Sequence, residues 1–180
     1  ESHPSTHYNV RWFGASFAGF LRESAQDQPH LSEMAEFEWA MTLAFDAPDQ
    51  PALTVEDMSS VSPEAWPEMT FALHPSLHRL KLNFNVPEIW KAVDQEEDLP
   101  ALKSRAAAWI LWRRDYKTYF RSLSEDESFA LAALASGTNF AGICAGLANW
   151  VDEDGVALHA AGLLKGWIAE GLLRSVAVAV

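Results

Sequence analysis

The feature that most constrains the fold is a stretch with a period of two residues, 106–123, which reads AAAWILWRRDYKTYFRSL. Successive side chains of a strand point to opposite faces, and a turn near Arg114 and Asp115 would place Arg113 opposite Tyr116. One face then carries Trp109, Leu111, Thr118 and Phe120, and the other Ile110, Trp112 and Tyr119. Because both faces are largely apolar, the sheet must be covered twice, by its own helices and by another domain or a partner.

A second stretch with this period is 69–84, MTFALHPSLHRLKLNF, which predicts another hairpin with a turn at Pro75 and Ser76. It contains His74 and His78, four residues apart. One would end a strand and the other would begin the next, so the spacing that brings such a pair together on a helix does not apply. No Asp, Glu or Cys close in sequence completes a metal site. We therefore interpret the pair as a structural corner, with a metal site as the lesser alternative.

Helical periodicity and capping residues predict helices in the rest of the chain. Pro29 suits the first turn of one helix, Thr54 and Asp57 form a capping pair, and Ser124 with Glu127 forms a capping box. The predicted helices are 9–24, 29–47, two short ones in 54–68, 87–93, 124–137, 138–150 and 156–173.

Together these elements predict an α+β fold. An N-terminal helical segment, residues 1–60, would precede an α+β domain, residues 61–180, with a small antiparallel sheet and three C-terminal helices. Two strands followed by three short helices is a winged-helix-like order, here interpreted as a peptide-recognition element.

Glu38 lies in the middle of the apolar stripe of the helix over 29–47, whereas Glu33 and Glu36 fall on its opposite side. An unpaired buried carboxylate is costly. Two interpretations weigh equally: Glu38 is paired with a basic side chain or backbone N–H groups, or this edge of the helix meets water. A catalytic Glu38 is a distant third.

The charge of the chain argues against nucleic acid. The 180 residues carry 13 basic and 25 acidic side chains, a formal net charge of −12. A duplex-binding domain needs a basic patch for the phosphates, and the sequence offers only the short cluster Arg113-Arg114. No apolar run is long enough for a transmembrane helix, so we expect a cytoplasmic protein without a membrane partner.

The sequence shows no catalytic constellation. There is no phosphate loop, nucleophile elbow, zinc-protease or dinucleotide motif, and the six histidines are scattered. The single cysteine, Cys144, lies in an apolar helix and is interpreted as a buried core thiol. We therefore expect a binding module with no catalytic residue, no metal ligand and no cofactor of its own.

Four segments together span nearly the whole chain: HLSEMAEFEWAMTLAFDA, MTFALHPSLHRLKLNFNVPEIWKA, ILWRRDYKTYFRSLSEDESFALAALASGTNFAGICAGL and WIAEGLL. In this order they resemble the HvfC/BufC-type partner proteins of multinuclear non-heme iron oxidases. The family has a further N-terminal helical domain, often labelled DNA-binding. Residues 1–24 resemble only its end, so that domain is expected to be missing, as in a shorter partner subunit of the methanobactin type.

The resemblance implies a partner role. Such proteins present a cysteine-containing precursor peptide, made on the ribosome, to the oxidase, and the iron belongs to the oxidase. The leader peptide is expected to add as a strand beside residues 116–123 and to lie against the last helix. The implied peptide-binding residues are Tyr116, Thr118, Tyr119, Phe120, Leu163, Leu164, Trp167 and Ile168, although a core role is the simpler interpretation for most of the helix residues.

Two other functions stay open. The winged-helix-like order and the family label suggest a DNA-binding transcription regulator, against which the net acidity argues. A free-standing enzyme comes third. The surface that would meet the oxidase is also open, because residues 9–46 and the outer face of the sheet are both candidates.

Overall fold

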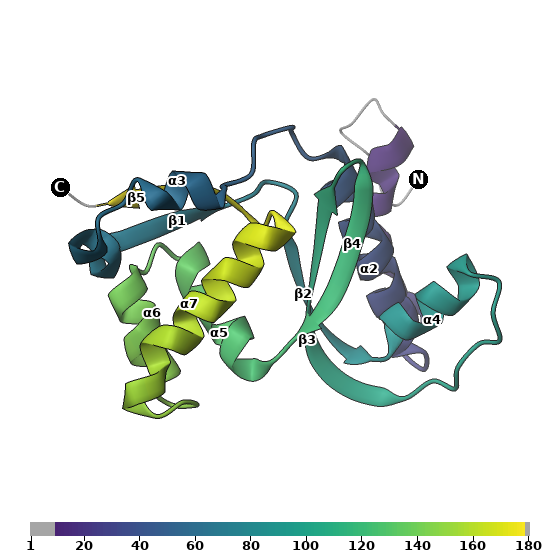
Figure 1. Cartoon of the computed structure of the whole chain (residues 1–180). Coiled ribbons are helices and arrows are strands. Elements are labelled where there is room, and N and C mark those ends of the chain that lie inside the picture. Colours follow the sequence, from purple (N-terminus) through teal and green to yellow (C-terminus); the bar gives the residue numbers. More distant parts are fainter. Residues whose placement is uncertain (1–9, 179–180) are drawn as a thin grey trace.

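The computed structural model describes residues 10–178, and it confirms an α+β fold. Residues 1–9, which include the predicted start of the first helix, lie outside the described range. The elements are η1 (Val10–Ser16), α1 (Phe17–Ser24), α2 (Pro29–Asp46), α3 (Val55–Ser59), η2 (Pro63–Glu68), β1 (Met69–Leu73), β2 (His78–Phe84), α4 (Val86–Asp94), β3 (Ser104–Arg114), β4 (Lys117–Leu123), α5 (Glu125–Ala135), α6 (Phe140–Leu147), α7 (Glu153–Glu170) and β5 (Leu173–Val178) (Figure 1).

The predicted hairpin over 69–84 is wrong, because its two strands lie in different sheets. β1 pairs antiparallel with β5, and β2 pairs with β3 in a sheet of order β2-β3-β4. Between β1 and β2, the buried His74 donates its backbone N–H to the carbonyl of Leu172, 2.8 Å away. The short connection thus carries the chain from one sheet to the other.

The hairpin of β3 and β4 is present, but its turn differs by one residue from the prediction. Asp115 and Tyr116 form the turn with φ values of 49° and 61°, and Arg114 pairs with Lys117. The predicted partner of Arg113, Tyr116, is therefore wrong, since Arg113 lies opposite Thr118. The predicted faces are nevertheless right, because a shift of two residues preserves the alternation of side chains.

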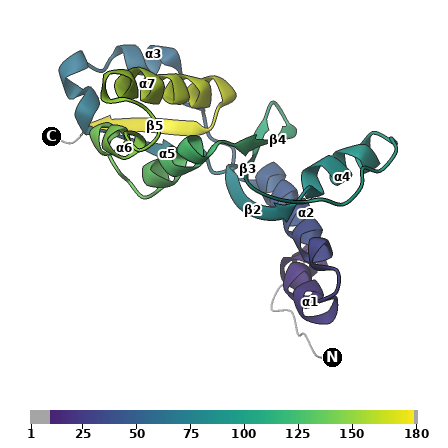
Figure 2. The same cartoon turned by 90° about the horizontal axis from the view of Figure 1, so that it is seen from below.

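Both apolar faces of this sheet are covered within the chain. On one face Leu82, Leu111 and Phe120 pack against Phe37 of α2 and Trp90 of α4. On the other face, Ile110 and Trp112 of β3 belong to a larger core. Its buried residues include Leu131 of α5, Leu164 and Trp167 of α7, and Leu173 of β5. Figures 1 and 2 show α2 and α4 on one side of the β2-β3-β4 sheet and α5–α7 on the other.

The larger core also includes Leu53 and Met58, from the segment before residue 60. The two cores therefore draw on residues from either side of the predicted boundary between 1–60 and 61–180.

Most helix starts predicted from capping residues agree with the structure. Pro29 begins α2, and Thr54 and Asp57 form the reciprocal capping box of α3. The capping box predicted for α5 is wrong, although Ser124 is its N-cap residue: Glu127 is buried and directs its carboxylate to Arg121 and Trp167 instead. The last helix, α7, begins and ends three residues earlier than predicted, which releases Leu173 to begin β5.

The acidic residues of α2 also differ from the expectation. Glu38 is exposed, so the interpretation that this edge of the helix meets water is the correct one. The buried acid is Glu33, whose carboxylate accepts hydrogen bonds from the backbone N–H groups of Asn83 and Phe84 and from the side chain of Asn83. The helix is therefore rotated so that Glu33, and not Glu38, faces the sheet.

His78, the first residue of β2, gives the fold a dependence on pH. Burial lowers the pKa of His78, and a hydrogen bond with the backbone of Leu43 offsets part of this shift. The unfolded chain then binds a proton at this site more readily than the folded chain, so stability present above about pH 6.5 is lost as the pH falls through the folded-state pKa.

We expect His78→Gln to flatten the decline in the free energy of unfolding that the unmodified protein shows between neutral and mildly acidic pH. Urea unfolding followed by tryptophan fluorescence at a series of pH values measures this. An unchanged slope in the variant would show that other groups cause the decline.

Candidate functional site

The outer edge of β4 is the predicted docking strand, and its free backbone groups follow from the register. The two-residue turn makes Arg114 and Lys117 a hydrogen-bonded pair, and such pairs alternate with non-hydrogen-bonded ones along an antiparallel ladder. Thr118, Phe120 and Ser122 therefore point their backbone N–H and C=O groups away from β3.

Contacts elsewhere in the sheet agree with this alternation. The same pattern directs the backbone N–H of Arg113 toward β2, where it donates to the hydroxyl of Ser76 at 3.2 Å. It also directs the N–H of Asn83 away from β3, where the carboxylate of Glu33 accepts it at 2.8 Å. These two hydrogen bonds follow the alternation that the register predicts. They therefore support the outward direction assigned to the backbone groups of β4.

The four predicted binding residues of the hairpin lie in different surroundings. Tyr116 is 82% exposed at the tip of the turn, and Tyr119 is 41% exposed with its ring stacked on Trp112. Thr118 is half-buried. Phe120 packs on Phe37 with the ring centroids 5.1 Å apart, so its side chain belongs to the core beneath α2. The two tyrosines thus form the accessible aromatic surface of this hairpin.

The four predicted residues of α7 contribute mainly to the core. Leu164 and Trp167 are 4% and 2% exposed, so their side chains offer no surface to a peptide. Leu163 and Ile168 are half-buried against the same core.

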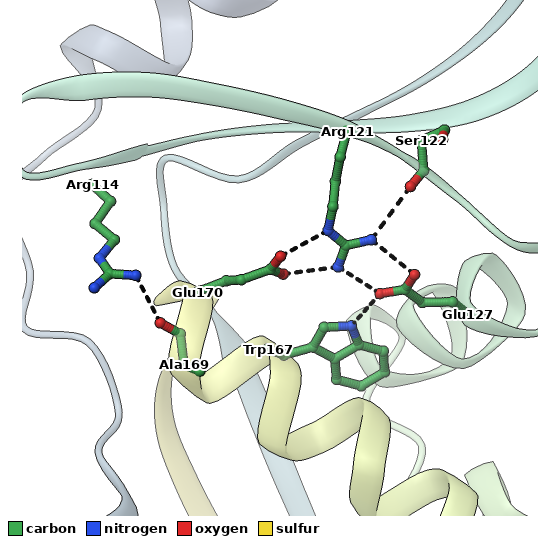
Figure 3. A network of polar contacts seen from close by, with 7 residues as sticks. All are labelled: Arg114, Arg121, Ser122, Glu127, Trp167, Ala169 and Glu170. Carbon is green, nitrogen blue, oxygen red and sulfur yellow. Dashed lines mark hydrogen bonds and ion pairs between the residues drawn. The ribbon is translucent and has the colours of Figure 1, made fainter.

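The sequence reasoning missed a polar network that connects β4 with α5 and α7 (Figure 3). Arg121 donates to both carboxylate oxygens of Glu127, at 2.7 and 2.8 Å, and to both oxygens of Glu170, at 2.8 and 2.9 Å. The indole N–H of Trp167 donates to Glu127 at 2.9 Å. The hydrogen bonds that Arg121 donates to Glu127, followed by those that it donates to Glu170, raise the pKa of Arg121 above its ordinary value despite its partial burial.

This network fixes the distance between β4 and the C-terminal end of α7. Arg114 adds a hydrogen bond to the carbonyl of Ala169, 2.9 Å away. Bidentate arginine–carboxylate pairs restrict orientation as well as distance. The network therefore positions the candidate edge relative to the helix. One signal could have revealed it, because Arg121 and Glu127 are oppositely charged and only six residues apart.

The described residues give no indication of a metal centre. Both ring nitrogens of His74 are engaged, Nδ1 with the hydroxyl of Ser76 at 2.8 Å and Nε2 with the carbonyl of Gln50 at 3.0 Å. Within residues 10–178 no three His, Cys, Asp or Glu side chains converge as a metal site requires. Burial raises the pKa of Cys144, which disfavours the thiolate. No helix in that range is long and apolar enough to cross a bilayer.

Comparison with models of protein families, with curated proteins and with solved structures finds no match to this chain. The segmental resemblance described above therefore stays a prediction.

The Arg121 network can be tested by removing its central acid. Glu127→Ala leaves the indole N–H of Trp167 without its acceptor and Arg121 with one carboxylate. We expect a loss of about 2–4 kcal/mol in the free energy of unfolding, measured in urea. Glu125→Ala, an exposed acid in the same helical turn, is the matched control and should lose much less. Equal losses of unfolding free energy in the two variants would mean that Glu127 stabilises the fold only as an acid in the first turn of α5, and that its network with Arg121 and Trp167 adds nothing.

Proposed function

We propose that this chain is a non-catalytic subunit that binds a ribosomally made precursor peptide and presents it to a multinuclear non-heme iron oxidase for cysteine modification. The observation that carries the proposal is the outer edge of β4, which pairs with no other strand within residues 10–178 and has outward backbone N–H and C=O groups at Thr118 and Phe120. An extended peptide satisfies such groups by adding as a further strand.

The surroundings of this edge support the proposal. Tyr116 and Tyr119 are exposed beside it, and tyrosine provides a large contact area with a polar tip. Leu163 and Ile168 supply half-buried apolar surface on α7. We extend the proposal to the fold: β3, β4 and α5–α7 act as a winged-helix-like peptide-recognition element, with the β3–β4 hairpin as the wing and the Arg121 network as its support.

The proposed division of labour follows the chemistry. The oxidase supplies iron and the oxidation of cysteine, while this chain lowers the entropic cost of bringing the peptide to the metal. Its formal net charge of −12 favours a peptide over the alternative of a DNA-binding regulator, because phosphate contacts need clustered cations.

The first test is co-purification. The tagged chain is recovered from extracts of its source cells, and the eluate is analysed by mass spectrometry and for iron. The proposal expects an iron-containing protein together with a short cysteine-containing peptide. Recovery of the chain alone, or oxidation of that peptide by this chain without the iron protein, contradicts it.

A pair of edge variants tests where the recovered peptide binds. Thr118→Pro removes an outward N–H without removing a bond to β3, and proline is tolerated on edge strands. We expect the peptide to bind about tenfold more weakly, as measured by fluorescence anisotropy.

Thr118→Ala, which keeps the N–H, is the matched control and should bind like the unmodified protein. Circular dichroism confirms that both variants are folded. Unchanged affinity in a folded Thr118→Pro variant rules out this edge. Proline at Tyr119 is unsuitable as a test, because the N–H of Tyr119 points toward β3 and its loss would damage the hairpin itself.

A further inference from the structure

The opposite edge of the same sheet, the outer edge of β2, also pairs with no other strand within residues 10–178, and its chemistry differs from that of β4. Along β2, the residues whose backbone groups point away from β3 are Arg79, Lys81 and Asn83. The carboxylate of Glu33 already accepts the N–H of Asn83. The backbone N–H and C=O groups of Arg79 and Lys81 have no strand partner in the sheet.

This edge lies between two hollows of similar size. One, of 680 Å³, is lined by residues of β2, η1, α1 and α2, and the other, also of 680 Å³, is lined by residues of β2, β3 and α5. Both are lined by the same three residues of β2, namely His78, Arg79 and Leu80. The edge therefore has space beside it on both faces of the sheet.

The hollow toward α1 and α2 has an apolar part, and the charged side chains of Arg22, Glu23 and Glu36 also line it. Phe17 and Phe20 of α1 are 50% and 48% exposed, and Trp39 and Leu43 of α2 line the same space. Leu80 points to this side because it alternates with Arg79 and Lys81. An apolar side chain entering from the edge would find apolar contacts here.

The hollow toward α5 is basic. Arg79 and Lys81 line it together with Leu77 and Phe129, and both cations are exposed. Neither forms an ion pair with another residue in the described range 10–178. Two cations without an acidic partner among the described residues therefore lie side by side on this edge, in a chain with almost twice as many acidic as basic residues.

We infer that the β2 edge binds an extended segment of a partner protein in which apolar and acidic side chains alternate. The segment pairs its backbone with Arg79 and Lys81. Because successive side chains point to opposite faces, its apolar residues enter the hollow beside α1 and α2, and its acidic residues lie beside the two cations. This site is on the opposite edge from β4 and does not depend on the proposed function.

The charges also decide between a partner and a second copy of this chain. Antiparallel pairing of two β2 edges would bring Arg79 and Lys81 of one copy close to those of the other, and like charges directly opposite are destabilising. Basic residues on an edge strand guard against such self-pairing. The same charges attract an acidic strand. The β2 edge therefore disfavours pairing with a second copy of itself and favours pairing with a segment of opposite charge.

The test uses short synthetic peptides with a fluorescent label, measured by anisotropy against the whole chain. One peptide alternates valine and glutamate, a second alternates valine and lysine, and a third has the composition of the first with its valines and glutamates in separate blocks. We expect the first to bind about tenfold more tightly than the other two.

Two changes to the peptide and the protein make the result specific to this edge. In Arg79→Glu/Lys81→Glu the preference should invert, so that the lysine peptide binds more tightly, which also shows that the variant is folded. N-methylation of one alternate set of amides in the glutamate peptide should abolish binding, and methylation of the other set should not, because only one set faces β2.

Three results would overturn the inference: no preference between the three peptides, a preference that the double variant does not invert, or equal effects of the two methylation patterns. Loss of binding in Thr118→Pro with normal binding in Arg79→Glu/Lys81→Glu would place the peptide on β4 and also overturn it. Failure of the precursor peptide to bind at β4 would leave these outcomes unchanged, so the two proposals fail separately.

Discussion

The structure depends on one strand that is buried on both faces. In β3 the neighbours Ile110 and Leu111 are both fully buried, yet they belong to different cores. The helices α2 and α4 cover one face and α5–α7 the other, so most of the apolar surface of the sheet is buried within the chain. What stays accessible is therefore the edges, and this is why both proposals concern backbone groups of β2 and β4.

At one end of each edge strand, β2 and β4, a charged side chain already forms hydrogen bonds with the outward backbone groups. On β2, Glu33 accepts the N–H groups of Asn83 and Phe84. On β4, the guanidinium of Arg121 donates to the carbonyl of Ser122 at 3.3 Å. Each of these contacts shortens the length of backbone that a docking strand can pair with. The remaining positions differ in chemistry, since tyrosines accompany β4 and unpaired cations accompany β2.

Local patterns in the sequence predicted what depends on local geometry. The two faces of 106–123 follow from the alternation of side chains alone, so they are right even though the turn is misplaced by one residue. Proline and the Thr54–Asp57 pair locate the starts of α2 and α3 for the same reason. The outward tyrosines of β4 and the edge position of this strand were also within reach of the sequence.

Other features depend on partners that are distant in the sequence. The pairing of β1 with β5 joins residues such as Met69 and Val178, and the short strand LRSVAV carries a weak pattern that the helix before it obscured. The predicted side of α2 is wrong for Glu33, because a carboxylate is buried only where N–H groups donate to it, and those of Asn83 and Phe84 are distant in the sequence. Glu127 fitted a capping box in the sequence, but Arg121 and Trp167 offer it stronger partners.

The separation of the two cores along the chain has a consequence for the order of folding. Every member of the core beneath α2 lies between Met34 and Phe120, whereas the other core also needs Leu172 and Leu173. During synthesis, the first core is complete well before the ribosome has added β5. Contacts that close short loops form faster than distant ones. The β2-β3-β4 sheet is thus expected to emerge from the ribosome as an early folding unit, with β1 waiting for its partner strand until the last helix has been made.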